Sequence, residues 1–257
     1  MKAKVFLFFF CLFLCFVSYA QKDTSRIVLT PKQEGRFISQ NALFLGFHFG
    51  GSRMLNKMEG AYDFFKNGGS LGQCYGISIE KGLAKNFFFS SRLSMMEVWD
   101  KRSYEIGPFT GEGSNAFWAS QASIHVGYRV IGPKNYNYLN VAVGLENGFA
   151  LQDRGTSSIS GLTITGPALK EGDLYSYTAS HELNKNWYSA ISLELSKDFK
   201  IFKGFYMSIT YSTQFGLRRF FVSDINYYLF GSQKAKPTRS FMDGTQQQFL
   251  LGIKYKF

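Results

Sequence analysis

Side chains suited to acid–base chemistry are few in this chain, and their spacing does not resemble a hydrolase. There are three histidines, His48, His125 and His181. Ser123 and His125 are two residues apart, which in a strand puts them on one face and predicts a hydrogen bond between them. His181 precedes Glu182. A serine–histidine–acid triad is recognised by geometry, and none of these spacings indicates one, so the sequence predicts no catalytic residue.

Metal, redox and phosphate sites are not expected either. Of the three cysteines, only Cys74 lies beyond the first 20 residues, and clusters of Cys and His with metal-ligand spacing are missing. The segment 111–113 (Gly-Glu-Gly) lacks the lysine and the strand-to-helix context of a phosphate loop. We therefore expect no cofactor, and we interpret Cys74 as a small buried residue.

A larger polar set alternates with apolar residues along the chain. Its acids and bases are nearly balanced, and on one face of the predicted strands they would line a common interior. The set is Glu80, Arg92, His125, Arg129, Glu146, Glu194, Gln214 and Lys254. Charges in a narrow interior must be paired, so we expect a lumen closed by ion pairs. A proton or ion path is the functional alternative, although about eight strands leave only enough interior for side chains.

The strands that position this set are read from a period of two. In the last twelve residues, Phe249, Leu251, Ile253, Tyr255 and Phe257 share one face. Similar alternation predicts seven more strands, at about 42–51, 71–81, 87–99, 117–131, 138–151, 187–197 and 204–217. The sequence thus predicts an all-β fold, an eight-stranded antiparallel up-and-down transmembrane β-barrel. A soluble barrel of the lipocalin type is the competing fold, and it would need the apolar face inside.

The connections between these strands alternate in length. Residues 52–70, 100–115, 152–185 and 218–245 are long connections, and 82–86, 132–137 and 198–203 are short. Outer-membrane barrels have short periplasmic turns and long external loops, so we expect both termini in the periplasm. Within the third long connection, segments 158–165 and 173–179 also alternate, which suggests a hairpin that extends the neighbouring strands.

The N-terminal residues suggest export. Residues 1–20 combine Lys2 and Lys4, an apolar run and a small-residue end, which predicts a signal peptide. We expect residues 21–40 to form a periplasmic lead-in and residues 41–257 to form the barrel domain. No later apolar run approaches the ~20 residues of a spanning helix.

Aromatic and basic residues are expected at the two membrane interfaces. Predicted girdle residues are Trp99, Trp118 and Trp187 at the outer ends of their strands, with Phe87, Tyr128, Phe205, Tyr255 and Phe257 at the inner ends. Beyond residue 20 the formal net charge is +9, and +7 of it lies at the inner rim, in Lys81, Lys85, Lys134, Lys197, Lys200, Lys203, Lys254 and Lys256 against Asp198. These lysines suit phospholipid head groups, and nucleic acid is not an expected partner.

The fourth long connection carries candidate contact residues. They are Phe220, Phe221, Tyr227, Tyr228 and Phe230, followed by three basic residues. We expect them either to contact a protein partner or lipopolysaccharide phosphates, or to pack together over the barrel mouth.

With its signal peptide, eight alternating strands and final Phe257, the chain resembles the small outer-membrane barrels, namely OmpA- and OmpX-type domains and PorT-like barrels associated with type IX secretion. The resemblance implies that Tyr255 and Phe257 form the C-terminal signal read by the barrel-assembly machinery. It implies a location in the outer membrane, among lipid and lipopolysaccharide. The expected role is structural, adhesive or secretion-accessory through external loops, with a lipid A-modifying enzyme or a narrow pore as alternatives.

Overall fold

The computed structural model describes residues 42–60, 65–69, 71–83, 86–106, 109–131, 137–151, 157–160, 175–183, 186–229 and 236–257. The predicted signal peptide (1–20) and lead-in (21–40) lie outside the described residues. No helix in the described part of the chain is long and apolar enough to cross a membrane.

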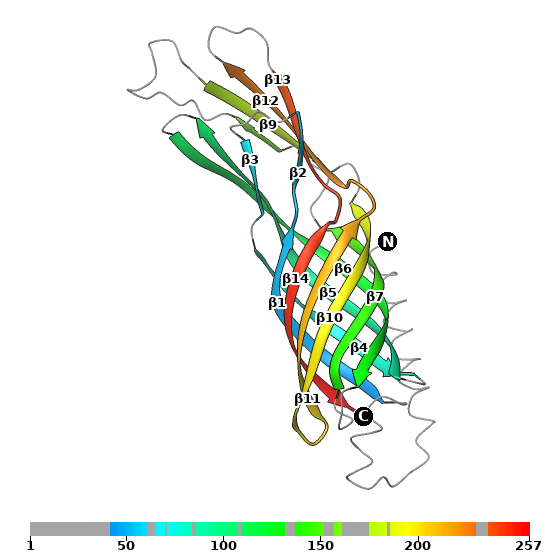
Figure 1. Cartoon of the computed structure of the whole chain (residues 1–257). Coiled ribbons are helices and arrows are strands. Elements are labelled where there is room, and N and C mark those ends of the chain that lie inside the picture. The colour runs from blue at the N-terminus through cyan, green and yellow to red at the C-terminus, as the bar shows by residue number, and fades with distance from the viewer. Residues whose placement is uncertain are drawn as a thin grey trace.

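Eight strands close into a barrel (Figure 1). They are β1 (Leu43–Met54), β4 (Gly72–Gly82), β5 (Phe87–Ile106), β6 (Phe109–Ile131), β7 (Asn137–Ala150), β10 (Trp187–Phe202), β11 (Phe205–Gly216) and β14 (Gln246–Lys256). Each pairs antiparallel with its neighbour along the chain, and β1 pairs with β14 to close the cylinder. The predicted eight-stranded antiparallel barrel is therefore confirmed.

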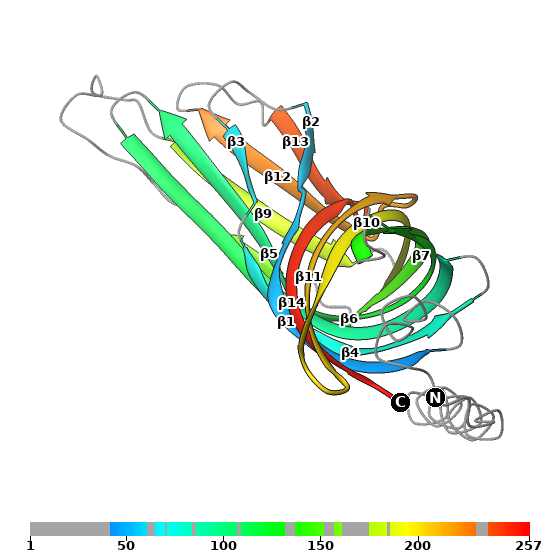
Figure 2. The same ribbon diagram turned by 60° about the horizontal axis from the view of Figure 1, so that its bottom comes forward.

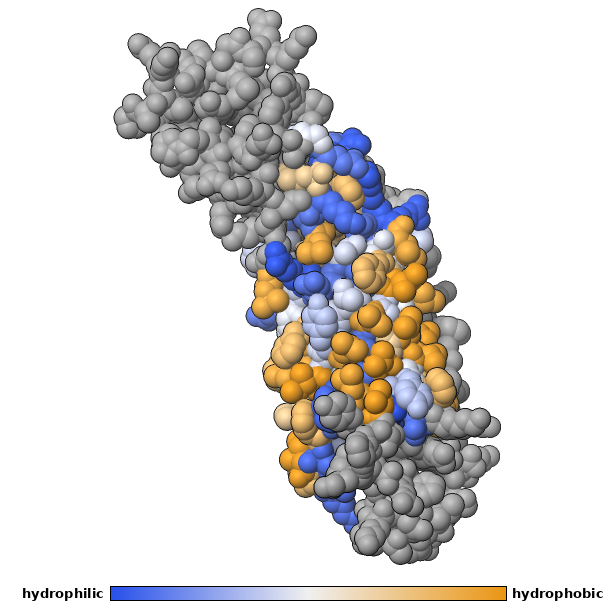
Figure 3. All heavy atoms as spheres, viewed as in Figure 1, coloured by the Kyte–Doolittle hydropathy of each residue, from blue (hydrophilic) through white to orange (hydrophobic). Residues whose placement is uncertain are grey.

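The two faces of the barrel strands differ sharply in polarity. Outward side chains such as Phe47, Val143 and Leu145 are 52%, 56% and 60% exposed, whereas inward His125 and Glu146 are buried. Figure 3 shows outward residues as an apolar belt across the middle of the visible face. A soluble barrel would need the reverse arrangement, so the lipocalin-type alternative is wrong.

Two of the long connections contain more β-strand pairing than the sequence predicted. Residues 100–115, expected to be a loop, continue the β5–β6 hairpin, in which Ile106 pairs with Phe109. Residues 52–70 complete β1 and contain β2 (Lys57–Glu59) and β3 (Phe65–Gly69), and β3 pairs with β5. The prediction failed because strands beyond the barrel wall need no lipid-facing side, so pairing continues where alternation fades.

A second sheet stands at one end of the barrel, which we call the sheet end; the opposite end, with the β10–β11 turn, is the turn end. The sheet has the order β2-β13-β12-β9-β8, with β8 (Ser157–Ser160), β9 (Tyr175–Leu183), β12 (Phe221–Leu229) and β13 (Lys236–Met242). Residues 218–245 are thus not simply a loop. The expected hairpin of the third connection exists in part, but β9 pairs with β12 instead of extending the barrel.

An apolar core joins the barrel to the second sheet. Its ring contacts include Phe117 with Phe221 (centroids 5.6 Å apart) and Tyr188 with Phe220 (4.8 Å). The buried cluster comprises Met54, Cys74, Met96, Val98, Phe117, Ala119, Ala150, Tyr188, Phe220, Phe221, Met242 and Leu250. These residues close the lumen at the sheet end.

Candidate functional site

The lumen at the turn end is closed by an aromatic cluster around one arginine. Phe44 and Tyr206 pack edge to face, with centroids 5.4 Å apart. The Arg129 guanidinium lies over the rings of Phe44 and Phe88, at 5.6 and 5.3 Å from their centroids. Arg129 is 1% exposed and donates to Glu80. Cation–π contacts of a desolvated guanidinium are stabilising, so this cluster forms a compact plug.

Above this plug lies a first group of ion pairs, Glu80, Arg129, Lys254 and Asp198. Lys254 Nζ donates to Glu80 Oε2 at 2.8 Å and lies 3.0 Å from Asp198 Oδ1. Asn140 Nδ2 donates to Asp198 Oδ2 at 2.9 Å. Each carboxylate therefore meets at least two donors, which offsets the cost of burying its charge.

A second group lies nearer the middle of the lumen. Arg92 donates to Glu194 Oε2 at 2.6 Å. His125 Nε2 lies 2.9 Å from Glu146 Oε1, 3.0 Å from Ser192 Oγ and 3.9 Å from Glu194 Oε2. The predicted lumen set of Glu80, Arg92, His125, Arg129, Glu146, Glu194 and Lys254 is thus placed inside the barrel, in two groups.

Strand register explains why these long side chains fit. The Cα partners of Arg92 are Ser78 and Ser123, and those of Glu194 are Ala142 and Ser212. Small residues beside each large one leave room for it in a narrow interior.

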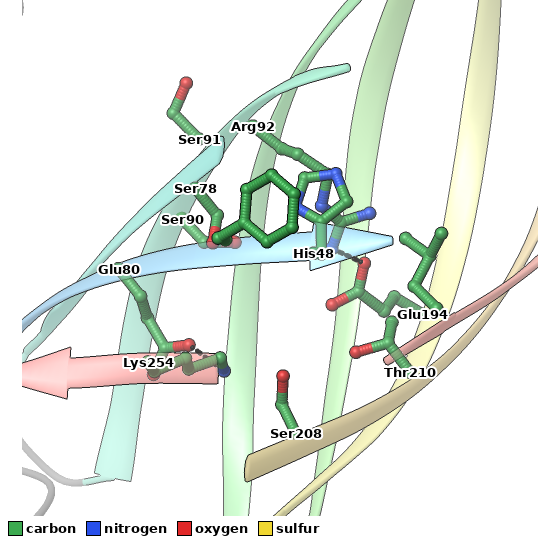
Figure 4. Close-up of a pocket in the computed structure, with 12 residues that line it drawn as sticks. His48, Ser78, Glu80, Ser90, Ser91, Arg92, Glu194, Ser208, Thr210 and Lys254 are labelled. Atoms are coloured by element: carbon green, nitrogen blue, oxygen red, sulfur yellow. Dashed lines mark hydrogen bonds and ion pairs between the residues drawn. The ribbon is translucent and has the colours of Figure 1, made fainter. Parts of the chain in front are cut away.

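A small cavity of about 30 Å³ remains between the two groups. It is lined by hydroxyl side chains and by members of both groups, and Figure 4 shows Arg92, Glu194, Glu80 and Lys254 around it. A polar cavity needs roughly 10–15 Å³ to hold one water molecule, so this one has room for water. The cavity does not amount to a channel.

The predicted lumen set did not include every buried polar residue of the lumen. Gln121, Gln246 and Gln248 join the anticipated Gln214 in a buried amide layer beneath the apolar core. Gln121 Nε2 donates to Gln214 Oε1 at 2.7 Å, and Gln248 Nε2 donates to Gln121 Oε1 at 2.9 Å. Their even spacing on the inward face of β14 and β6 is the signal that would have found them.

Among the described side chains, His125 does not have the geometry of a catalytic triad. Ser192, His125 and Glu146 come together, but both contacts use Nε2, whereas a triad needs the acid and the serine on different ring nitrogens. The expected Ser123–His125 hydrogen bond is wrong, since the hydroxyl at His125 is that of Ser192. His48 Nε2 lies 3.0 Å from Ser94 Oγ. The His181 side chain lies outside the described part, and within that part no group of His, Cys, Asp or Glu could hold a metal.

The predicted girdle aromatics lie on the outer surface in clusters. At the turn end, Phe87 contacts Tyr128 (5.2 Å between centroids), and Phe205 contacts Tyr255 (4.8 Å). Towards the sheet end, Trp118 lies 5.9 Å from Tyr75, and Arg218 lies 5.0 Å from the Trp187 ring centroid. One expectation is wrong: Trp99 and Trp118 do not end their strands, because β5 and β6 continue beyond them.

The candidate contact residues divide into two kinds. Phe220 and Phe221 are 0% and 2% exposed, so they pack over the barrel mouth and their side chains offer no outer contact surface. Tyr227 and Tyr228 belong to β12, but their side chains, like all of Phe230, lie outside the described part. Arg219 and Arg239 instead make exposed ion pairs with Glu59 and Asp224.

Comparison with known proteins supports the fold. No protein-family model matches the chain, and no curated protein matches it. Outer membrane protein OprG from Pseudomonas aeruginosa is similar in structure, with a TM-score of 0.50 and 11% sequence identity over 85% of this chain and 97% of OprG.

Two further solved structures align more loosely. A major outer membrane protein from Thermus thermophilus has a TM-score of 0.41 and 13% identity, over 84% of this chain and 99% of that one. Outer membrane protein AlkL has a TM-score of 0.38 and 14% identity, over 85% and 91%. The likeness to OprG, at 11% identity, carries the fold alone, and by that measure the chain has the fold of an outer-membrane β-barrel.

Proposed function

We propose that the protein is an integral outer-membrane barrel that acts through its second sheet, in a structural, adhesive or secretion-accessory role. The observation that carries the proposal is the sheet itself. It contains strands from three of the four long connections and extends the molecule well beyond the barrel (Figure 1). Loops and extensions on a rigid scaffold are where binding surfaces usually lie.

The filled lumen supports this role over transport through the barrel. Ion pairs and amides fill its middle, the Arg129 cluster closes the turn end, and the apolar core closes the sheet end. A narrow pore is the alternative. Steady ion flux through the purified protein in planar bilayers would favour the pore.

We further infer that the sheet end faces the cell exterior and the turn end faces the periplasm, as in small barrels of the OmpA/OmpX or PorT-like type. The short β10–β11 turn supports this orientation, because such barrels keep short turns on the periplasmic side. Labelling of intact cells at a cysteine introduced at exposed Arg239, compared with one at exposed Lys203, tests the assignment.

Shortening the β12–β13 hairpin tests the role of the sheet. Replacing residues 225–238 by a Gly-Ser turn keeps Asp224 paired with Arg239 and keeps the core residues Phe221 and Met242. We expect a folded barrel of normal abundance whose cells show the same defect as cells lacking the gene. Full complementation by the shortened protein would contradict the proposal.

A lipid A-modifying enzyme is the alternative of a different class, and the contact of His125 with Ser192 and Glu146 is the observation in its favour. Substituting His48, His125 and His181 together and analysing lipid A by mass spectrometry distinguishes this enzyme from the proposed role of the second sheet. Unchanged lipid A would eliminate the enzyme.

A further inference from the structure

The tip of the β10–β11 hairpin carries large apolar side chains on its surface. Phe199, Ile201 and Phe202 are 42%, 55% and 57% exposed, and Gly204 turns the chain with a φ of 80°. The hairpin projects beyond the neighbouring barrel strands at the turn end (Figure 2). Contiguous exposed apolar residues mark a surface that meets a partner or a membrane rather than water.

An aromatic cluster makes this tip continuous with the end of β14. Ring centroids are 4.4 Å apart for Phe202 and Phe205, 4.8 Å for Phe205 and Tyr255, and 5.0 Å for Tyr255 and Phe257. The apolar surface of the tip therefore joins the lipid-facing belt of the barrel and can lie along the same acyl chains.

Basic side chains surround the apolar tip. Lys200 and Lys203 are exposed, and Lys197 Nζ lies 5.9 Å from the centroid of the Phe199 ring. The acidic residue of the hairpin, Asp198, instead contacts Lys254 and Asn140. Among the described residues, no carboxylate forms an ion pair with Lys200 or Lys203.

We propose that this tip binds an anionic phospholipid, with the phosphate accepting hydrogen bonds from the Lys200 and Lys203 ammonium groups and an acyl chain along Ile201, Phe202 and Phe205. Lysine stems can lie on apolar surface while the ammonium reaches the head-group level. A free phosphate would leave the exposed rings in water, so the apolar part of the site favours a lipid. The inference rests on the proposed membrane location.

Native mass spectrometry of the full protein in a non-ionic detergent tests the site. Phosphatidylglycerol and phosphatidylcholine of matched chains would be titrated against wild type and against Lys200→Gln/Lys203→Gln. One lysine near an anionic surface is worth about 1 kcal/mol, so the loss of two should lower the preference of wild type for phosphatidylglycerol by roughly thirtyfold in the double variant. An unchanged preference, or none in wild type, would overturn the proposal.

The control removes the same charge from the other end of the molecule. Arg53 and Arg218 form no ion pair with a described carboxylate, so Arg53→Gln/Arg218→Gln should keep the preference. An equal loss there would indicate a general charge effect and would refute a local site. Phe202→Ser should weaken the binding of both lipids to the same extent. Inorganic phosphate should not compete with phosphatidylglycerol for the site. A protein that stays folded and dispersed without detergent would refute the membrane location itself, which is a separate result.

Discussion

At the scale of single residues, the lumen shows how charge is kept in a narrow interior. Glu80 is 6% exposed and is bound by both Arg129 and Lys254, which come from opposite parts of the chain. Such a group adds little net stability compared with an apolar filling, because desolvation offsets the attraction. Removing one member is costly, because the remaining charges stay buried without compensation.

We therefore expect Glu80→Gln to lower the free energy of unfolding by about 3–5 kcal/mol, since it leaves the buried cations Arg129 and Lys254 with Asp198 as the one carboxylate of the group. Unfolding by urea in lipid vesicles, followed by tryptophan fluorescence, measures the change. Asp224→Asn is the control, because its pair with Arg239 is half-exposed on both sides and should contribute far less than the buried group. Equal losses in the two variants would contradict this account of the lumen.

Asp243 gives a pH dependence outside the barrel wall. Burial opposes its ionisation, but hydrogen bonds from Lys57 Nζ (2.5 Å) and from the backbone N–H of Thr245 (2.9 Å) lower its pKa below the ordinary value of 3.8. A lowered folded-state pKa contributes stability that is present above pH 3.8 and is lost as the pH falls through the folded pKa. Asp243→Asn should be less stable than wild type at about pH 6, and the gap should close below pH 3.8. A gap independent of pH would show that the carboxylate charge is not responsible.

At the scale of the strand, large and small residues alternate around the lumen wall. Glycines on the inward face make room for the largest side chains. A Cβ at Gly148 would lie 2.0 Å from Tyr188 Cζ, and one at Gly144 would lie 2.3 Å from His125 Cδ2. The rings of Tyr188 and His125 thus occupy the space that a side chain on β7 would fill.

Gly148→Ala should displace Tyr188 from its contact with Phe220 and cost about 1–3 kcal/mol of stability through overpacking. The matched control is Gly46→Ala, where the added Cβ would lie 2.7 Å from the Ser78 hydroxyl, which can rotate away. Chemical denaturation of both variants and a near-UV spectrum of the tyrosine environment provide the measurement. A larger loss of stability in Gly46→Ala than in Gly148→Ala would contradict this explanation.

At the scale of the whole molecule, closure of the barrel creates an outer surface that must be apolar. It also creates an interior whose polar groups must find hydrogen-bond or ion-pair partners. With β1 paired to β14, all eight barrel strands have partners on both sides, as a hydrocarbon environment requires. The apolar belt then meets lipid, and Ile124, 55% exposed, lies on β6 between the interface residues Trp118 and Tyr128.

Ile124→Arg should therefore destabilise the barrel in vesicles by about 2–4 kcal/mol, the cost of a lipid-facing arginine near the bilayer midplane. Gln247→Arg, at an exposed position beside Arg53 near the sheet end, should cost at most about 1 kcal/mol. Refolding into vesicles followed by urea unfolding distinguishes them. If the two substitutions lower the free energy of unfolding equally, the apolar belt is not the part of the barrel that spans the membrane.

Much of the barrel was readable because each membrane strand has one face in lipid and one in the lumen. That constraint imposes a period of two, so the strand that contains Ile124 and His125 is evident from its residues alone. Three strands of the second sheet, β2, β12 and β13, escaped prediction because they lie beyond the barrel wall, where no lipid-facing side imposes the alternation. The paired β5–β6 extension through Gly111 and Gly113 was expected to be a loop for the same reason.

By itself the sequence determined which side chains point inward, how many strands form the barrel and that the chain closes on itself. Only the tertiary structure decided which inward groups meet. Lys254 reaches Glu80, 174 positions away, and Arg92 reaches Glu194, 102 positions away. Such contacts depend on the stagger of the strands around the cylinder and on which adjacent residues have small side chains. The alternation of polar and apolar residues along a strand gives no information on either.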